Sequence, residues 1–320
     1  MKKLTKPALF LFLLLYLLPQ TVCAARLLVP VGQLIGISLQ DNSVTVAAFD
    51  QKLGKTSEKA GLKTGDRILS IDGQTITCAQ DVKDALLRSG GTVKLTVLRG
   101  KKEKSLRLTP EITTDGPKLG VLLKEGMTGV GTVTYYDPES GKYGALGHGV
   151  HAPAGSLLAM RSGNAYEAAL VSVKKGKVGT PGQLMGTLQA ESYIGTVSKN
   201  TNQGIFGKAN TPWQGQVLPV GESSEIQTGS ATIRSTVAGN GVQEYSVEIM
   251  KIYPSDDTRN MLLKVTDAEL LATTGGIVQG MSGSPIIQDG KLIGAVTHVL
   301  VNDPTTGYGI FIENMLDAAA

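Results

Sequence analysis

Ser282 stands between two glycines in the segment GMSGSP at 280–285, just ahead of an apolar run expected to form a strand. A serine in a tight turn before a strand exposes its hydroxyl to a substrate. Neighbouring glycines let backbone amides point inward, where they can stabilise an oxyanion. The segment therefore indicates nucleophilic chemistry at a seryl hydroxyl, with Ser282 as the first candidate and Ser284 as the alternative.

Three histidines could supply the base that such a serine needs, because histidine has an ordinary pKa near neutrality. His148 lies between glycines in the segment GALGHGV at 144–150, and we expect it to be the base. His151 is the alternative, and His298, in a strand expected after the serine, is expected to be structural. No Glu or Cys stands at zinc-ligand spacing beside them, so neither a metal nor another cofactor is expected.

Short strands must position these residues. From residue 118 onward, alternating apolar runs are separated by Gly and Asn, at 129–136, 168–174, 215–220, 230–237 and 244–252. Several short strands at this spacing favour a β barrel or sandwich. One helix is expected in this region, from Asp267 to about Ala272, where Thr266 and Glu269 form a capping box.

Residues 29–112 are expected to form a separate unit. Its clearest segment is AGLKTGDRILSIDGQTI at 60–76, in which apolar residues alternate as in a half-buried strand and Asp72-Gly73 predicts a tight hairpin. A helix follows at 81–87, with Val82, Ala85 and Leu86 on one face.

The segment at 60–76 resembles a PDZ domain. Such domains bind an extended peptide by adding it as a strand to a sheet edge. The resemblance implies a carboxylate-binding loop ahead of the first strand, at Gly32, Leu34, Ile35 and Gly36, whose backbone amides could form an anion-binding nest.

The first 25 residues are typical of a targeting segment. Lys2, Lys3 and Lys6 precede an apolar run at 8–18, which is too short for a helix that spans a bilayer, and small residues follow at 21–25. We expect a signal peptide cleaved after Ala24 or Ala25, with a short membrane anchor as the alternative.

The composition indicates the class of protein, the number of domains and the partners that can be expected. With 320 residues, 41% hydrophobic and 18% charged, the chain is expected to be globular and to hold two domains. Loss of residues 1–25 removes three lysines and no acid, so the net charge falls from +4 to +1 and gives no reason to expect a nucleic-acid partner. Cys78 is then the single cysteine, which excludes an intramolecular disulfide and a thiolate metal cluster.

The serine segment resembles the Gly-Asp-Ser-Gly-Gly-Pro turn of chymotrypsin-like proteases. The match implies Ser282 as the nucleophile, with the amides of Gly280 and Ser282 as the oxyanion hole. Together with the resemblance to a PDZ domain, the match implies a mainly β chain. In this chain a PDZ-like α/β domain at 29–112 precedes a chymotrypsin-like β-barrel serine peptidase domain at 113–320.

Longer segments resemble the stage IV sporulation protein B peptidases of spore-forming Firmicutes: GALGHG at 144–149, KVTD at 264–267, GGIVQGMSGSP at 275–285 and GIFIENML at 309–316. This resemblance implies a catalytic triad of His148, Asp267 and Ser282. The residues by themselves leave the acid open, because Asp267 also suits the first turn of a helix. Asp137, Asp256 and Asp257 are the alternative acids.

The same resemblance implies a biological role. Such peptidases are exported to the space between the two forespore membranes, where they cleave a regulator of the membrane metalloprotease that processes pro-sigma-K. They also cleave themselves, and their PDZ domain handles targets. Two alternative functions remain. The first is an envelope quality-control protease, although such proteases carry the PDZ domain after the protease domain. The second is a non-catalytic exported PDZ adaptor.

Overall fold

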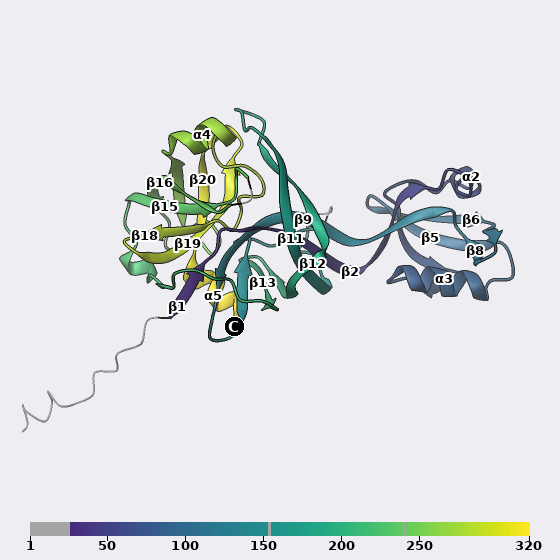
Figure 1. Cartoon of the computed structure of the whole chain (residues 1–320). Coiled ribbons are helices and arrows are strands. Elements are labelled where there is room, and N and C mark those ends of the chain that lie inside the picture. The colour runs from purple at the N-terminus through teal and green to yellow at the C-terminus, as the bar shows by residue number, and fades with distance from the viewer. Residues whose placement is uncertain (1–25, 153–154, 240) are drawn as a thin grey trace, which may run out of the picture.

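The computed structural model describes residues 26–152, 155–239 and 241–320, so the predicted targeting segment lies outside the described residues. The described chain forms two β barrels and a smaller α/β unit that is joined to them by a two-stranded ribbon (Figure 1). The predicted mainly β fold class, with a PDZ-like unit and a barrel-type domain, is confirmed. In these ranges no helix is both long and apolar enough to cross a membrane.

Six strands close the first barrel. β9 pairs with β10, and the pairings continue through β13, β12, β11 and β2 back to β9. These strands are β2 (Leu34–Phe49), β9 (Val121–Tyr136), β10 (Lys142–Ala145), β11 (Met160–Lys174), β12 (Gln183–Thr201) and β13 (Gly204–Ala209). β1 (Leu27–Pro30) and β14 (Leu218–Pro219) extend the sheet beside β9. Alternate residues of β2, such as Ile35 and Ile37, fill the core of this barrel.

The second barrel is closed by six antiparallel strands of the C-terminal part. They are β15 (Gly229–Ser235), β16 (Gln243–Ile252), β17 (Met261–Val265), β18 (Pro285–Gln288), β19 (Lys291–Leu300) and β20 (Asp303–Phe311). A 3₁₀ turn, η1 (Ser223–Glu225), precedes them, and α4 (Ala268–Thr274) and α5 (Ile312–Ala319) complete this part. Asp289 and Gly290 both have positive φ angles, 52° and 73°, as a two-residue hairpin between β18 and β19 requires.

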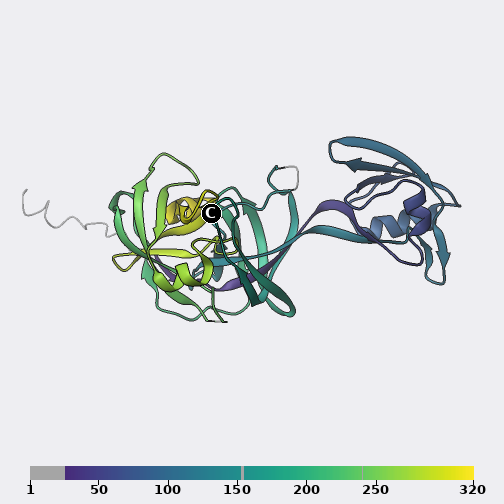
Figure 2. The same ribbon diagram turned by 90° about the horizontal axis from the view of Figure 1, so that it is seen from above.

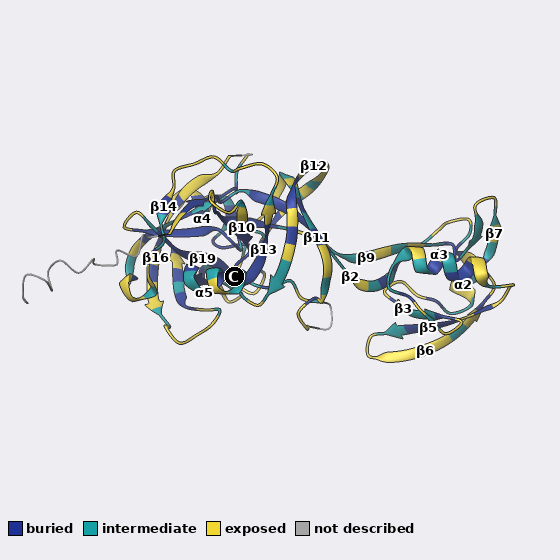
Figure 3. Cartoon of the chain, turned by 90° about the horizontal axis from the view of Figure 1, so that it is seen from below, coloured by how far each residue is buried: buried dark blue, intermediate teal, exposed yellow. Residues whose placement is uncertain are grey.

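The barrels pack against each other and against α5. Leu28 and Tyr135 belong to the first barrel, Leu292 and Ile310 to the second, and together with Met315 of α5 they form one buried apolar cluster. In Figure 3 the buried residues gather inside the barrels and inside the α/β unit, whereas the outer strand β6 (Lys102–Leu108) is mostly exposed. The cluster therefore fixes how the two barrels face each other.

The α/β unit holds α2 (Lys55–Lys59), α3 (Ala79–Arg88), β3 (Arg67–Ile71), β4 (Gln74–Thr75), β5 (Val93–Arg99), β6, and the hairpin of β7 (Glu111–Thr113) and β8 (Gly116–Lys118). Val82, Ala85 and Leu86 are buried in α3, and Asp72 and Gly73 form the β3–β4 turn with positive φ angles, so both sequence predictions are confirmed.

A buried ion pair supports this unit. The carboxylate of Asp66 is fully buried and accepts two hydrogen bonds of 2.6 Å from the guanidinium of Arg99. The backbone amide of Lys63 donates a third hydrogen bond, of 2.9 Å, to Asp66 Oδ2.

The α/β unit is inserted into the first barrel rather than placed before it. β2 leaves the barrel after Leu39, which pairs with Met127, and continues outward so that Val44 pairs with Glu125 (Figure 2). Gly126 at this irregular step has a φ of 65°, and a Cβ there would overlap the Leu39 carbonyl oxygen. The strand pair β2–β9 thus contributes side chains to two cores, that of the first barrel and that of the α/β unit.

The predicted boundaries at 29–112 and 113–320 stay predictions, and the hydrophobic cores extend across them. Val29, Ile35 and Leu39 pack in the first barrel, whereas Leu119 and Val121 pack in the core of the α/β unit. The alternation of apolar residues along β2 predicts which side chains are buried, but it does not say which core receives them. The core of the PDZ-like unit accordingly includes side chains from Val44 of β2 to Leu123 of β9.

Candidate active site

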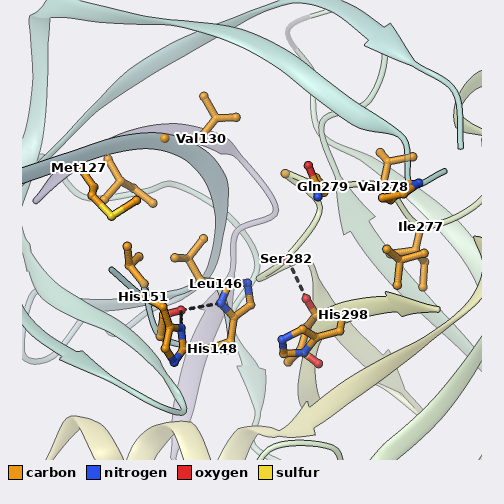
Figure 4. Close-up of a pocket in the computed structure, with 18 of the residues that line it drawn as sticks. Met127, Val130, Leu146, His148, His151, Ile277, Val278, Gln279, Ser282 and His298 are labelled. Atoms are coloured by element: carbon orange, nitrogen blue, oxygen red, sulfur yellow. Dashed lines mark hydrogen bonds between the residues drawn. The ribbon is translucent and has the colours of Figure 1, made fainter. Parts of the chain in front are cut away.

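The two barrels enclose a cleft of about 580 Å³, lined from the first barrel by residues such as Leu146 and His148 and from the second by residues such as Ser282 and Val299. Figure 4 shows Ser282 between His148 and His298, with Gln279 on the adjoining segment. The packing of the barrels brings together residues that are 134 positions apart in the sequence. Ser282 and His148, the predicted nucleophile and base, therefore line one cavity.

Tertiary contacts hold the turn around Ser282. The amide of Thr132 donates to the Ser282 carbonyl oxygen at 3.0 Å, and the Thr132 hydroxyl donates to the Gly280 carbonyl oxygen at 2.8 Å. Gly280 and Gly283 have φ angles of 100° and 98°, and a Cβ at Gly283 would overlap the Thr132 carbonyl oxygen. Position 283 therefore requires glycine, because the first barrel approaches the turn so closely.

The two predicted oxyanion-hole amides are available. Within the described ranges, neither the Gly280 amide nor the Ser282 amide donates to a protein acceptor, whereas the intervening Met281 amide donates to the Val278 carbonyl oxygen at 3.1 Å. The segment before them is fixed by the β11–β12 loop: the Gln279 amide donates to the Gly182 carbonyl oxygen at 3.0 Å, and the Leu184 amide donates to the Gln279 carbonyl oxygen at 2.8 Å. The Gly280 and Ser282 amides are thus free, on either side of the Met281 amide, which is already hydrogen-bonded. Two free amides in this arrangement can bind an oxyanion.

The Ser282 hydroxyl donates to the Thr297 carbonyl oxygen at 2.7 Å. It must rotate away from this acceptor to donate to an imidazole, and catalytic hydrogen bonds commonly form only with substrate bound. The alternative nucleophile, Ser284, is fully buried and donates to the hydroxyl of Ser235 at 3.0 Å. Ser284 is therefore part of the core and does not reach the cleft.

The His148 imidazole is oriented by a backbone carbonyl. Its Nδ1 lies 2.9 Å from the Gly149 carbonyl oxygen, which can only accept, so Nδ1 carries the proton and Nε2 is left as the basic nitrogen. Burial lowers the pKa of His148, the bond to Gly149 opposes that shift, and a charge on His151 adds to it. The lowered pKa keeps the imidazole neutral, as a general base must be.

The other two histidines lie beside the base. His151 Nδ1 is 3.1 Å from the same Gly149 carbonyl oxygen, and the ring centres of His148 and His298 are 5.0 Å apart. His298 keeps an exposed edge, yet burial of the rest of its ring, with the charges of His148, Arg259 and His151, lowers its pKa to about 4. His298 thus faces the cleft, although the sequence suggested only a structural role.

The predicted acid, Asp267, does not face His148. Asp267 is the N-cap of α4, where its carboxylate accepts from the Leu270 amide at 2.9 Å and from the Ser246 amide at 3.3 Å. It does not line the cleft, and the cap residue is Asp267 itself rather than the expected Thr266. Its place in the triad is thus not supported by the geometry.

The alternative acids are placed differently. Asp137 forms an ion pair of 2.8 Å with Arg26 and does not line the cleft. Asp256 and Asp257 line a polar hollow that His148 and His298 also border, but Asp256 accepts from the amides of its own loop. No hydrogen bond joins any of these carboxylates to His148 within the described residues. Nor does any group of three His, Cys, Asp or Glu side chains in these ranges suit a metal ion.

The predicted peptide-binding loop is wrong. Gly36 pairs with Val130 of β9 on one side and with Tyr166 of β11 on the other, so this part of β2 has no free edge. Leu34 and Ile35 are buried, and Gly32 packs against Arg234 of the second barrel. All four residues therefore belong to the barrels.

A different groove lies in the α/β unit. It is bordered by α3 and by the start of β9, including Val82, Leu86, Gly120 and Leu122. Leu122 is 61% exposed although it is apolar. The sequence carries a signal for this groove in the run Leu-Gly-Val-Leu at 119–122, where Gly120 has a φ of 67°, but this run falls within the predicted peptidase domain.

The fold and the cleft define a serine peptidase. The model of the SpoIVB peptidase S55 family matches residues 115–316, and the model of the PDZ domain matches residues 33–109. The chain belongs to the SpoIVB peptidase S55 family.

Curated relatives match over shorter stretches. Serine protease HTRA1 of Xenopus tropicalis is 42% identical over 55 residues, which is 17% of this chain and 12% of that protein. A putative zinc metalloprotease of Mesorhizobium japonicum is 34% identical over 73 residues, which is 22% of this chain and 20% of that protein. The chain thus spans about a fifth or less of the length of these relatives.

Two solved structures are similar in part. A PDZ domain of the SdrC-like protein from Listeria monocytogenes is 26% identical, covers 26% of this chain and 87% of its own, and has a TM-score of 0.22. The active form of the Rv3671c protease from M. tuberculosis is 14% identical, covers 75% of this chain and 84% of its own, and has a TM-score of 0.37.

Proposed function

We propose that this serine peptidase is an exported endopeptidase in which Ser282 is the nucleophile and His148 is the general base. The observation that carries the assignment is the cleft itself, where the Ser282 hydroxyl, the His148 imidazole and two unbonded amides converge from two barrels. His148 Nε2 would take the proton of the Ser282 hydroxyl as its oxygen attacks a peptide carbonyl. The amides of Gly280 and Ser282 would hold the oxyanion, and Nε2–H would then protonate the leaving amine.

The Gly149 carbonyl would take over part of the role that an aspartate has in the usual triad. It selects the tautomer of His148 and fixes the ring, as the acid does. A neutral carbonyl stabilises an imidazolium less than a carboxylate does, so the enzyme is expected to be slower than a protease with a complete triad.

A peptide substrate would bind as an added strand. β18 covers one edge of β19 only as far as Ala295, and the cleft lies beside the uncovered stretch that includes His298 and Val299. An extended peptide can pair with this edge through its backbone, which places one of its carbonyls at the oxyanion amides. The uncovered edge therefore favours an unfolded segment of a protein as substrate.

For the biological role, we propose cleavage of a membrane-associated regulatory protein, and of the enzyme's own chain, as a signal between compartments during sporulation that leads to pro-sigma-K processing. Membership of the SpoIVB peptidase S55 family supports this role. The site of action would be the space between the forespore membranes, reached by export. The α3–β9 groove would select the protein target, because PDZ domains capture extended peptides between a helix and a strand edge.

Replacement of Ser282 by alanine tests the chemistry. The Ser282→Ala variant should lose labelling by a fluorophosphonate probe and lose self-cleavage, with a fall in rate of about 10⁶-fold. Ser284→Ala is the matched control, since it removes a hydroxyl from the same turn but not from the cleft. Wild-type processing by Ser282→Ala would show that another nucleophile acts.

Substitution in the α3–β9 groove tests target selection separately. Leu122→Asp places a charge in the groove and should slow cleavage of the membrane-associated target while labelling of Ser282 is kept. Ile112→Asp is the control, because Ile112 is 80% exposed on the same unit and does not line the groove. Equal effects of the two variants on target cleavage would contradict the assignment of the groove.

A further inference from the structure

The cleft carries no formal charge along its walls. Of the described residues that line it, none is Asp, Glu, Lys or Arg, and the polar side chains are Ser282, Gln279, two threonines and three histidines. A charged substrate side chain beside Ser282 would lose water and meet no partner of opposite charge, which disfavours its binding strongly. The lining therefore points to an uncharged substrate at the bond that is cut.

The space beside the oxyanion amides is already filled. The Gly280 and Ser282 amides directly follow the segment 277–279, so a substrate residue whose carbonyl sits at these amides lies beside that segment. Ile277 on that segment is only 2% exposed, and its Cδ1 lies 2.6 Å from the point that a Cβ on Gly307 of β20 would occupy. The Ile277 side chain thus occupies the floor between the segment and the barrel strands.

The sides of this space are also apolar. Val278 is 1% exposed and packs against Gly182 of the β11–β12 loop, and Val299 of β19 lines the opposite side. The space beside Ser282 that Ile277 and Val278 leave open is therefore bordered by apolar side chains.

We propose that the peptidase cleaves after residues with small, uncharged aliphatic side chains, and that Ile277 is the residue that determines this specificity. The inference rests on the proposed function, because it takes Ser282 as the nucleophile and places the scissile carbonyl at the two amides. It predicts rejection by two mechanisms: large side chains clash with Ile277, and charged side chains lack a partner in the cleft. One methylene in an apolar pocket is worth roughly 10–200-fold in kcat/KM, so a side chain as large as phenylalanine should be discriminated clearly.

A set of extended peptides that differ only at the residue before the scissile bond tests the proposal on the full-length protein. For wild type, Ala and Val should be cleaved with kcat/KM roughly 10-fold or more above Phe, and roughly 100-fold above Lys or Glu. Ile277→Ala should raise the Phe-to-Ala ratio about 10-fold, and Ile277→Val should raise it by less, while Lys and Glu stay poor. Val171→Ala is the control, because Val171 is 65% exposed and does not line the cleft.

Fluorophosphonate labelling of Ser282 in every variant separates the two hypotheses. Labelled wild-type enzyme that cuts after Lys or Glu as fast as after Ala overturns the specificity proposal and leaves the proposed function intact. An unchanged Phe-to-Ala ratio in labelled Ile277→Ala also overturns it. If Ile277→Ala is not labelled, Ile277→Val decides, because a shift in its ratio supports the proposal and no shift opposes it. Loss of labelling in wild type would instead refute the proposed function.

Discussion

Replacement of Asp267 by asparagine separates catalysis from helix capping. Asparagine keeps a side-chain oxygen that can accept the hydrogen bond of the Leu270 amide, and Asn and Asp are about equally good N-cap residues. The lost negative charge near the start of α4 costs roughly 0.5 kcal/mol. Because the Asp267 carboxylate contacts the Ser246 and Leu270 amides and not His148, we expect kcat/KM to stay within about twofold of wild type.

Asp267→Ala provides the stability control. It removes the acceptor as well as the charge, so the free energy of unfolding should fall by about 1 kcal/mol or slightly more. For a domain of this size such a loss lowers Tm by roughly 2–4 °C. The alanine variant should therefore be less stable but nearly as active as wild type when assayed well below its Tm.

Peptide cleavage under saturating conditions, combined with thermal unfolding, distinguishes the two roles. An aspartate that orients the catalytic histidine supports a rate about 10⁴-fold higher than asparagine does at the same place. A fall in kcat of that order in Asp267→Asn, at unchanged Tm, would refute the assignment of Asp267 as a cap alone. It would also show that α4 moves toward His148 when substrate binds.

Three further predictions concern the base, the inserted unit and the oxyanion segment. Burial lowers the pKa of His148 and only the neutral ring acts as a base, so kcat/KM should fall in acid with a midpoint below pH 6.5. His151→Gln removes a charge that lowers this pKa and should move the midpoint upward. A wild-type midpoint above pH 6.5 would contradict the assignment of His148 as the base. Asp66→Ala removes the acceptor of two Arg99 hydrogen bonds and should lower the denaturant midpoint of the inserted unit, as measured by denaturant titration, with little loss of active-site labelling. Gly182→Ala makes a Cβ overlap backbone atoms beside the segment 279–282, which carries the two oxyanion amides. The variant should lower kcat roughly 10- to 100-fold with little change in KM. An unchanged kcat would show that the β11–β12 loop does not position the amides.

Local patterns predicted the local features of this chain well. The helix at 81–87, the two-residue turn at Asp72-Gly73 and the glycine-bounded turn at Ser282 all depend on residues that are close in sequence. Their backbone geometry follows from side-chain periodicity and from the conformations that glycine allows. The cap of α4 was predicted one residue too early, because Thr266 was expected to cap the helix and Asp267 does so.

The place of the PDZ-like unit could not be predicted in this way. The sequence shows two apolar stretches, at 34–39 and 44–49, which the structure joins in one strand, β2; the first fills the core of a barrel and the second fills the core of the inserted unit. The choice between cores depends on pairing with β9, whose partner residues lie more than 70 positions later in the chain. The peptide-binding loop was misplaced for the same reason, because the free strand edge beside α3 belongs to β9.

The sequence by itself indicated a serine between glycines and a histidine between glycines as the candidates for the reactive groups, because those residue types carry the chemistry and the glycines leave them accessible. The tertiary structure decided which groups surround them. Barrel packing closes the first barrel onto the turn at Gly283, sets the Gly149 carbonyl against His148, brings His298 into the cleft and turns Asp267 away. These contacts join residues from separate strands, and only the closure of two barrels around a shared interface fixes their distances.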